Sequence, residues 1–258
     1  MLPIKKLTII GLAIVSLIVI IYACNTSSRQ QSPIISQPSV TIPRILVFTK
    51  TNGFYHESIP TGAAAMQQLG KQNNFIADTT SNAQYFTNDS LRNYSAVMFL
   101  NTTMNVLNDE QQVAFERYMQ SGGGFVGVHA ATDTEYDWPW YNKLVGAYFA
   151  SHPKQQTATI NVTDKNHPST SFLPSKWERF DEWYNFKSVQ SDLTVLAWLD
   201  ETTYEGGKMG GSHPFAWYHE YDGGKAFYTA GGHTKESYSD SLFMRHVLGG
   251  IMYVIGAK

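Results

Sequence analysis

Residues 95–128 have the sequence SAVMFLNTTMNVLNDEQQVAFERYMQSGGGFVGV, and this stretch decides the fold. Residues 95–100 and 124–128 are uninterrupted apolar runs of strand length, typical of parallel strands buried on both faces. Between them, a helix is expected over residues 109–120, with Asn108 as its N-terminal cap. The stretch therefore predicts two parallel strands joined by a helix.

The same alternation continues on both sides of this unit. Residues 44–49 (RILVFT) form another apolar run, and the helix-forming residues 60–69 follow, with Gly70 as the expected stop. Residues 225–229 predict a late strand before a final helix, whereas residues 155–221 alternate apolar and polar side chains and predict antiparallel strands or a cap. We therefore expect an α/β fold: a mainly parallel sheet with helices on both faces and an inserted antiparallel, aromatic segment.

The first 24 residues predict a lipoprotein-type signal or an N-terminal anchor. Lys5 and Lys6 precede an apolar run over residues 7–23, and the only cysteine of the chain, Cys24, follows it. This pattern resembles a bacterial lipoprotein signal, in which that cysteine is lipidated; the alternative is an uncleaved N-terminal anchor helix. Both predict an exported, membrane-attached protein on the periplasmic or cell-surface side, and they differ in whether lipid or a helix holds it.

The rest of the chain divides into a linker and one domain. Residues 25–43 are rich in Ser, Gln and Pro and predict a flexible linker, which leaves residues 44–258 as the folded domain. Nineteen Lys and Arg against 21 Asp and Glu give a net charge of −2, which argues against a nucleic-acid partner. A single cysteine excludes an internal disulfide and any C-x-x-C motif.

Three of the eight histidines follow predicted strands. They are His56, His129 and His233, and His152 lies in a loop that can fold over the same edge. Because ligands of open parallel sheets bind beyond the carboxyl ends of the strands, we expect these side chains to meet there. His167, His219 and His246 are interpreted as structural.

The histidines admit three interpretations. His129, His152 and His233 can bind a divalent metal such as zinc, with Glu57 or Glu182 as a carboxylate ligand. The same imidazoles can instead act without metal in acid–base catalysis or substrate binding, or they can be structural.

Two acidic groups complete the candidate site. Asp181 and Glu182 lie among aromatic residues, and neighbours on a strand face opposite sides, so we expect Glu182 to reach the site and Asp181 to form a structural ion pair. Asp133, Glu135 and Asp137 are interpreted as a solvated loop rather than as catalytic residues.

Several common catalytic motifs are excluded. Residues 122–127 satisfy G-x-G-x-x-G but precede their strand, so no helix N-terminus would face a dinucleotide. The sequence has neither a G-x-S-x-G elbow nor a P-loop, and its only thiol lies in the export signal.

The chain resembles the ThuA-like (trehalose-utilisation) family, which has a class I glutamine-amidotransferase-like, flavodoxin-like fold. The motifs that carry the resemblance are GFYHESIP (53–60), GGGFVGVHAAT (122–132), SHP (151–153), DEWYNF (181–186), PFAW (214–217) and GHT (232–234). Amidotransferases carry a cysteine at the turn where this sequence has His129, so the resemblance implies the fold but not glutaminase activity. It also implies a role in the catabolism of trehalose-type glycosides or keto-sugars.

A sugar substrate makes aromatic and polar side chains the expected contacts. Trp138 and Trp140 are the tryptophans best placed to stack on a sugar, although packing under a loop is an equal alternative. The candidate sugar-binding residues are Tyr55, Asn101, Asp133, Trp138 and Tyr184.

We therefore expect an exported, membrane-tethered enzyme that acts on a glycoside or keto-sugar. His129, Glu182 and His56 are its candidate catalytic residues, with a divalent metal as an optional cofactor. The alternatives are a non-catalytic carbohydrate-binding lipoprotein and an accessory subunit of a sugar oxidoreductase partner.

Overall fold

The computed structural model describes residues 42–256. The expected signal or anchor, and the expected linker except for its last two residues, lie outside this range. Among the described residues, no helix combines the length and the hydrophobicity that crossing a membrane requires.

A nine-stranded sheet organises the domain, in the order β2-β1-β3-β4-β11-β10-β9-β6-β7. The first five strands are parallel: β2 (Ile76–Thr80), β1 (Arg44–Phe48), β3 (Ala96–Leu100), β4 (Gly124–Val128) and β11 (Gly224–Thr229). Taken in chain order, they have the 2-1-3-4-5 arrangement of flavodoxin-like sheets. The expected α/β class is confirmed, and the parallel strands of the sheet end at one edge.

The inserted segment extends the same sheet. Its four antiparallel strands are β10 (Pro214–Tyr221), β9 (Thr194–Leu199), β6 (Gln156–Val162) and β7 (Lys176–Asp181). A separate two-stranded sheet pairs β5 (Tyr148–Ser151) with β8 (Asn185–Lys187). Of the two expected alternatives, antiparallel strands or a cap, the structure has the strands.

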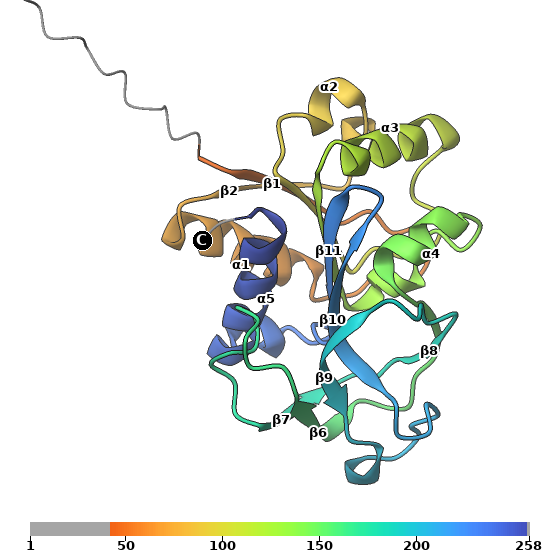
Figure 1. Ribbon diagram of the computed structural model, residues 1–258, viewed down its shortest axis with the longest axis vertical. Helices are drawn as coiled ribbons and strands as arrows, with labels where there is room; N and C mark the ends of the chain where they lie inside the picture. Colours follow the sequence, from red (N-terminus) through yellow and green to blue (C-terminus); the bar gives the residue numbers. More distant parts are fainter. Residues whose placement is uncertain (1–41, 257–258) are drawn as a thin grey trace, which may run out of the picture. The chain divides into compact units, whose positions relative to one another are not determined.

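Helices cover both faces of the sheet (Figure 1). Helices α1 (Ile59–Gln72) and α5 (Ser241–Val254) lie on one face, and α3 (Asp109–Gln120) and α4 (Pro139–Val145) lie on the other. The short α2 (Asn88–Leu91) packs against α3. Single 3₁₀ turns are η1 (Ala83–Tyr85), η2 (His129–Asp133), η3 (Glu201–Thr203) and η4 (Glu236–Ser239).

Local sequence explains where two of these helices begin and end. The Asn108 side chain accepts a hydrogen bond from the Gln111 backbone, and the Gln111 side chain accepts one from the Asn108 backbone, so α3 begins with a capping box. The prediction that Gly70 ends the helix is wrong, because α1 continues to Gln72. Gly70 is buried within the helix, where a Cβ would lie 2.6 Å from the Phe75 carbonyl oxygen, so its role is close packing.

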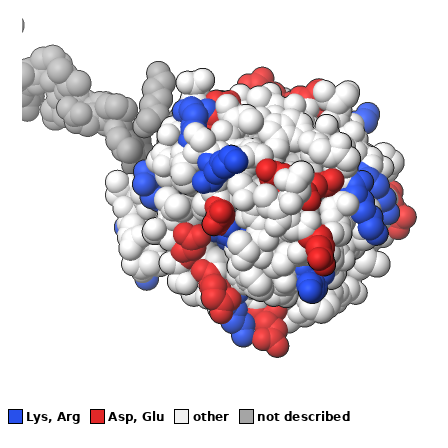
Figure 2. Space-filling model, turned by 90° about the horizontal axis from the view of Figure 1, so that it is seen from below, with Lys and Arg blue, Asp and Glu red and all other residues white. Residues whose placement is uncertain are grey.

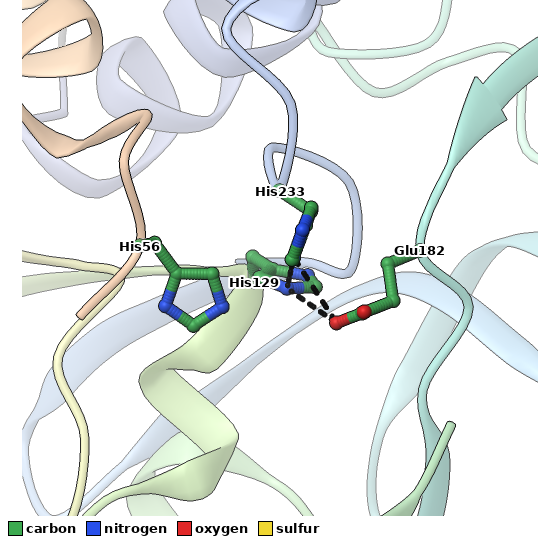
Figure 3. Close-up of side chains that lie close together, drawn as sticks. All are labelled: His56, His129, Glu182 and His233. Atoms are coloured by element: carbon green, nitrogen blue, oxygen red, sulfur yellow. Dashed lines mark hydrogen bonds and ion pairs between the residues drawn. The ribbon is translucent and has the colours of Figure 1, made fainter. Parts of the chain in front are cut away.

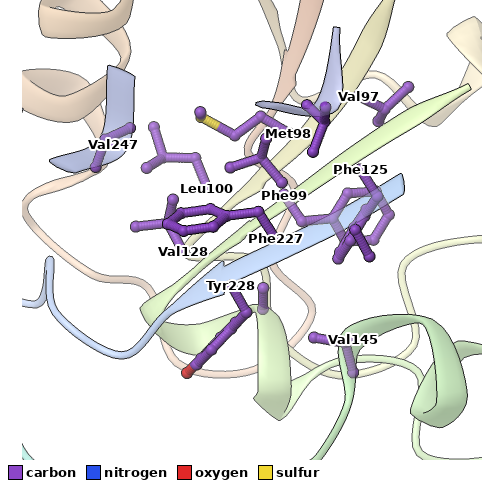
Figure 4. Packing of buried hydrophobic residues seen from close by; sticks show 14 of the residues in the cluster. Val97, Met98, Phe99, Leu100, Phe125, Val128, Val145, Phe227, Tyr228 and Val247 are labelled. Atoms are coloured by element: carbon purple, nitrogen blue, oxygen red, sulfur yellow. The ribbon is translucent and has the colours of Figure 1, made fainter. Parts of the chain in front are cut away.

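The core lies between the parallel strands and the helices (Figure 4). Phe99 of β3 is fully buried and packs on Phe115 of α3 and Phe125 of β4, with ring centroids 5.6 Å apart in both pairs. Burying one such side chain contributes about 1.5–3 kcal/mol, so this aromatic group fixes the strands that end at the candidate site.

Charges are mixed on the surface. On the face shown in Figure 2, acidic and basic side chains are interspersed, and Lys and Arg form no continuous patch. The absence of a nucleic-acid partner stays a prediction from the charge balance.

Candidate metal centre

Three histidines and one glutamate meet beyond the strand ends (Figure 3). His56 follows β1, His129 follows β4 directly, and His233 lies in the loop after β11. Glu182 follows β7. One ligand atom from each of the four lies within 4.8 Å of the others, and His56, His129 and Glu182 are buried. The expected convergence of histidines is present, with Glu182 as its carboxylate.

The backbone at His129 is held in an uncommon conformation. Its φ is +48°, in the left-handed region that costs a non-glycine residue energy. This sharp turn at the end of β4 leads into η2 and directs the imidazole to the shared centre. On the opposite side, Gly232 has φ +113°, and a Cβ there would lie 2.9 Å from both Tyr238 and Val128. Glycine at this position lets the His233 loop pack closely.

The tautomer of His129 follows from one contact. Nδ1 of His129 lies 2.8 Å from the Ala230 carbonyl oxygen, which can only accept, so Nδ1 carries the proton. In the neutral ring, Nε2 then presents a lone pair toward Glu182 Oε2, at 3.5 Å, and His233 Nδ1, at 3.2 Å. Metal-binding histidines typically donate their second N–H to a carbonyl in this way.

The distances fit a small tetrahedral cation. Zinc ligands about 2.0–2.1 Å from the ion lie about 3.3 Å from one another. The three ligand–ligand distances among His129, Glu182 and His233 are 3.5, 3.2 and 3.1 Å. His56 adds a fourth candidate ligand, because one of its ring nitrogens lies within 4.8 Å of the ligand atoms of the other three residues.

The electrostatics favour a neutral His56 beside an ionised Glu182. Burial, helped by the neighbouring His129 and His233, lowers the pKa of His56 to about 2, so this ring is neutral at physiological pH. Burial alone raises the pKa of Glu182, but the hydrogen bonds and charges of His129 and His233 outweigh it and lower that pKa. The centre therefore contains a buried negative charge that a bound cation would compensate.

Asp181 fixes the backbone of two candidate ligands, Glu182 and His233, by hydrogen bonds. It is fully buried and accepts hydrogen bonds from the backbone N–H groups of Glu182 (3.0 Å), Gly232 (2.9 Å) and His233 (3.1 Å). The Arg179 guanidinium pairs with it at 3.2 Å. The two neighbouring carboxylates thus divide as we had expected, with Glu182 in the centre and Asp181 in a structural ion pair.

Three other predicted residues border the centre. Nδ1 of His152 lies 3.2 Å from Glu182 Oε1, but this ring is partly exposed and outside the group of four. Tyr184 packs its ring 4.2 Å from that of His129. Asp133 lines a pocket of about 220 Å³ beside the centre, together with His152 and Tyr184. Burial raises the pKa of Asp133 in spite of a hydrogen bond from Tyr136.

Four expectations about individual residues need correction or a new role. Trp138 is buried in the core and donates a hydrogen bond to Glu116, so it packs under the loop and does not line the cavities beside the centre. Tyr55 is exposed and lines neither cavity at the centre. Asn101 is buried beneath the site, where it donates to Ser58, the Gly232 carbonyl and Tyr238. Glu135 is not solvated, because it is buried and accepts from the backbone of Val106 and Leu107.

The structure adds site residues that the sequence analysis missed. Gln155 contacts His233 Nε2 at 2.7 Å, and Phe54, Arg179 and Phe180 line the adjoining cleft. Of these residues, only Phe180 could have been predicted from the sequence. Strand β7 alternates exposed and buried residues, which places the aromatic ring of Phe180 on the polar, exposed face. His167, His219 and His246 are buried away from the centre and bonded to neighbouring groups, as a structural role requires.

Comparison with known proteins agrees with this fold. The family model of ThuA, described as trehalose utilisation, matches residues 44–254. A ThuA-like protein from Bacteroides uniformis has a TM-score of 0.70 at 24% identity, over 82% of this chain and 91% of that one. One from Parabacteroides merdae has a TM-score of 0.70 at 21% identity, over 84% and 91%.

More distant similarity extends to part of a glycosidase. A β-galactosidase from Bacillus circulans sp. alkalophilus has a TM-score of 0.57 at 12% identity, over 84% of this chain but 32% of the enzyme. At such identities the likeness shows the fold alone. No curated protein matches the sequence.

Proposed function

Because this chain belongs to the ThuA family, which is associated with trehalose utilisation, we propose that it is an enzyme acting on a trehalose-type glycoside or keto-sugar. In this proposal, His56, His129, Glu182 and His233 bind a divalent metal such as zinc. The observation that carries it is the convergence of three histidines and one carboxylate at the carboxyl edge of the parallel strands, with the His129 lone pair aimed at the Glu182 carboxylate.

A cation makes the centre electrostatically consistent. It would compensate the negative charge of Glu182, which is buried between His129 and His233. Without a metal, an N–H at His233 Nδ1 can fill the same place, because this nitrogen lies 3.1 Å from Glu182 Oε2 and 3.2 Å from His129 Nε2. The metal-free acid–base interpretation therefore remains the alternative. His56 supports the metal, because its ring is neutral and one ring nitrogen lies within 4.8 Å of the other candidate ligand atoms.

The chemistry proposed is activation of a sugar oxygen. When bound, a divalent metal acts as a Lewis acid that polarises a hydroxyl or carbonyl oxygen of the substrate. Asp133 and His152 line the pocket beside the centre and are not among the four candidate ligands. They are therefore the side chains placed to hold or move a proton. Tyr184 and Phe149 form an apolar wall of the pocket, against which the face of a sugar ring can pack.

Glutaminase chemistry is not part of the proposal. The structure places His129 at the sharp turn after β4, where amidotransferases have their nucleophilic cysteine, and the only cysteine of the chain is Cys24.

Location and partners are proposed from the sequence. The N-terminal lysines, the apolar run and Cys24 support an exported protein attached to a membrane by lipid or by an anchor helix. The proposed substrate is a small, uncharged sugar, and a sugar oxidoreductase remains a proposed partner.

Metal content tests the proposed centre. The full chain, purified in detergent without chelators, should contain about one divalent ion per chain by elemental analysis, and Glu182→Gln should lose it. Glu57→Gln is the matched control, because Glu57 is an exposed carboxylate of the adjoining cleft and pairs with Lys235. Retention of the ion by both variants, or its absence from all three proteins, would overturn the metal proposal.

Turnover then separates the candidate functions. Conversion of trehalose or its 3-keto derivative, lost in His129→Ala, would support the enzyme. Saturable sugar binding without conversion would support a binding protein, and conversion only with an added sugar oxidoreductase would support an accessory subunit.

A further inference from the structure

The two ring nitrogens of His233 have different neighbours. Nδ1 faces the candidate metal centre, 3.1 Å from Glu182 Oε2 and 3.2 Å from His129 Nε2. Nε2 lies 2.7 Å from the side-chain amide nitrogen of Gln155. Gln155 belongs to the loop between β5 and β6 and lines the adjoining cleft together with His233. The centre and an amide outside it therefore contact the same imidazole.

The contact with Gln155 decides which nitrogen of His233 carries the hydrogen. An amide nitrogen donates hydrogen bonds and does not accept them, so Nε2 of His233 accepts from Gln155. A neutral imidazole has one donor and one acceptor, so its hydrogen then lies on Nδ1. The Nδ1–H group points to Glu182 and His129, where the proposed metal would bind.

Metal binding requires the opposite tautomer of His233. To bind a metal through Nδ1, the neutral ring needs a lone pair on that nitrogen and its hydrogen on Nε2. Nε2–H would then face the amide nitrogen of Gln155, which is also a donor. A half-turn of the amide removes this conflict, because it brings the Gln155 oxygen to the same place. Gln155 is exposed, so its amide can turn without displacing packed neighbours.

We infer that Gln155 is a positioning residue that selects the tautomer of His233 and thereby sets the metal affinity of the centre. With the amide nitrogen toward the ring, an N–H group occupies the place of the ion. With the amide oxygen toward the ring, Nε2–H has an acceptor and the Nδ1 lone pair is free. Histidines that bind metals commonly donate their second N–H to an oxygen in this way.

The two arrangements differ in the position of one hydrogen and not in charge. The second arrangement rests on the proposed metal centre. The first concerns the metal-free protein alone, so it can be tested without a metal.

Nitrogen NMR of the full chain in detergent, isotopically labelled at the histidine nitrogens, tests the tautomers. The signals of His233 are those that disappear in His233→Gln. In the metal-free protein, its hydrogen should lie on Nδ1, and addition of Zn²⁺ should move it to Nε2. His129 should keep its hydrogen on Nδ1 in both states, because Nδ1 donates to the Ala230 carbonyl. A hydrogen on His233 Nε2 in the metal-free protein would overturn the inference.

Two variants separate the effect of the hydrogen bond from that of charge. The carboxylate of Gln155→Glu can only accept from Nε2–H, so competition with a chromophoric chelator should show a Zn²⁺ affinity about tenfold above that of the parent chain. Lys154→Gln is the matched control. It makes the same change in net charge at the neighbouring exposed position, and Lys154 lines neither cavity at the centre.

The control should bind Zn²⁺ within about twofold of the parent chain, because exposed charges are well screened. All three proteins are compared about two pH units above the ordinary histidine pKa of about 6.5, where a free imidazole is neutral. Equal affinities of Gln155→Glu and Lys154→Gln would contradict a tautomer-selecting role for Gln155.

The failures of the inference and of the proposed function differ. A parent chain that binds no Zn²⁺ would overturn the metal centre and, with it, the effect of Gln155 on metal affinity. Zn²⁺ binding without a change in the His233 tautomer, or without a gain in Gln155→Glu, would overturn the inference alone and leave the proposed centre standing.

Discussion

His129 donates a hydrogen bond from Nδ1 to the backbone oxygen of Ala230, at 2.8 Å, and so joins the ends of the neighbouring parallel strands β4 and β11. This single bond sets which ring nitrogen faces Glu182. It also ties the position of one candidate ligand to the strand that precedes another, His233. The order of the candidate metal centre therefore depends on the pairing of these two strands.

The conformation of His129 gives a prediction about stability. Its left-handed backbone suits Asn far better than a β-branched residue. Both His129→Asn and His129→Val should lose the metal, but urea denaturation of the metal-free proteins should show His129→Val less stable than His129→Asn by about 1 kcal/mol or more. Equal stabilities would contradict the strained turn.

Asp181 gives a prediction about positioning. Asp181→Asn removes the charge that pairs with Arg179 and weakens the bonds to the backbone of Glu182 and His233. Zinc affinity, measured by competition with a chromophoric chelator, should fall about 10- to 100-fold. Asp240→Asn is the matched control, because Asp240 also pairs with Arg179 but touches neither ligand. An equal loss of zinc affinity in the two variants would contradict the specific role of Asp181 in positioning Glu182 and His233.

His167 gives a prediction about pH. Burial lowers its pKa from 6.5 to about 4, against a smaller opposing effect of Asp164. Between these values, the unfolded chain binds a proton that the native chain does not, so stability falls as the pH drops through this window. The contribution reaches about 1.4 kcal/mol per pH unit.

A neutral replacement isolates this contribution. His167→Asn keeps an acceptor for the Ser169 backbone N–H and cannot titrate. Urea denaturation of the metal-free proteins at pH 7 and pH 5 should show a smaller loss of stability in the variant than in the parent chain. Parallel losses would mean that His167 titrates normally in the folded protein.

Cys24 gives a prediction about attachment. If the N-terminus is a lipoprotein signal, mass spectrometry of the membrane-bound protein should find a lipidated peptide that begins at Cys24, and Cys24→Ser should keep the full-length N-terminus. An unmodified full-length N-terminus in the parent chain would favour the anchor helix. Recovery of the parent chain in the soluble fraction, without membrane attachment, would contradict both.

Much of the fold could be predicted because its parallel strands are buried on both faces. Strands β3 and β4 are continuous apolar runs, and the cap of α3 is visible in Asn108. Strand β2 was missed because it lies at the edge of the sheet and ends in Asp78, Thr79 and Thr80, which lack that pattern.

Those residues of the candidate site that directly follow strands could be predicted, whereas those whose position depends on the path of a loop could not. His56, His129 and His233 converge because parallel strands end at one edge. The path of a loop depends on contacts distant in the sequence, so the burial of Trp138 and Glu135 and the approach of Gln155 to His233 had no local signal.

The four candidate ligands come from separate strand ends, and His233 follows β11, the last of these strands in chain order. No fragment that stops before β11 contains the whole set, so a nascent chain has no complete binding site until the loop after β11 has emerged and folded. For an exported protein, the compartment in which folding finishes then supplies the ion. Because sites of this kind select metals weakly by affinity alone, the metal found in the protein would report where the chain completed its fold.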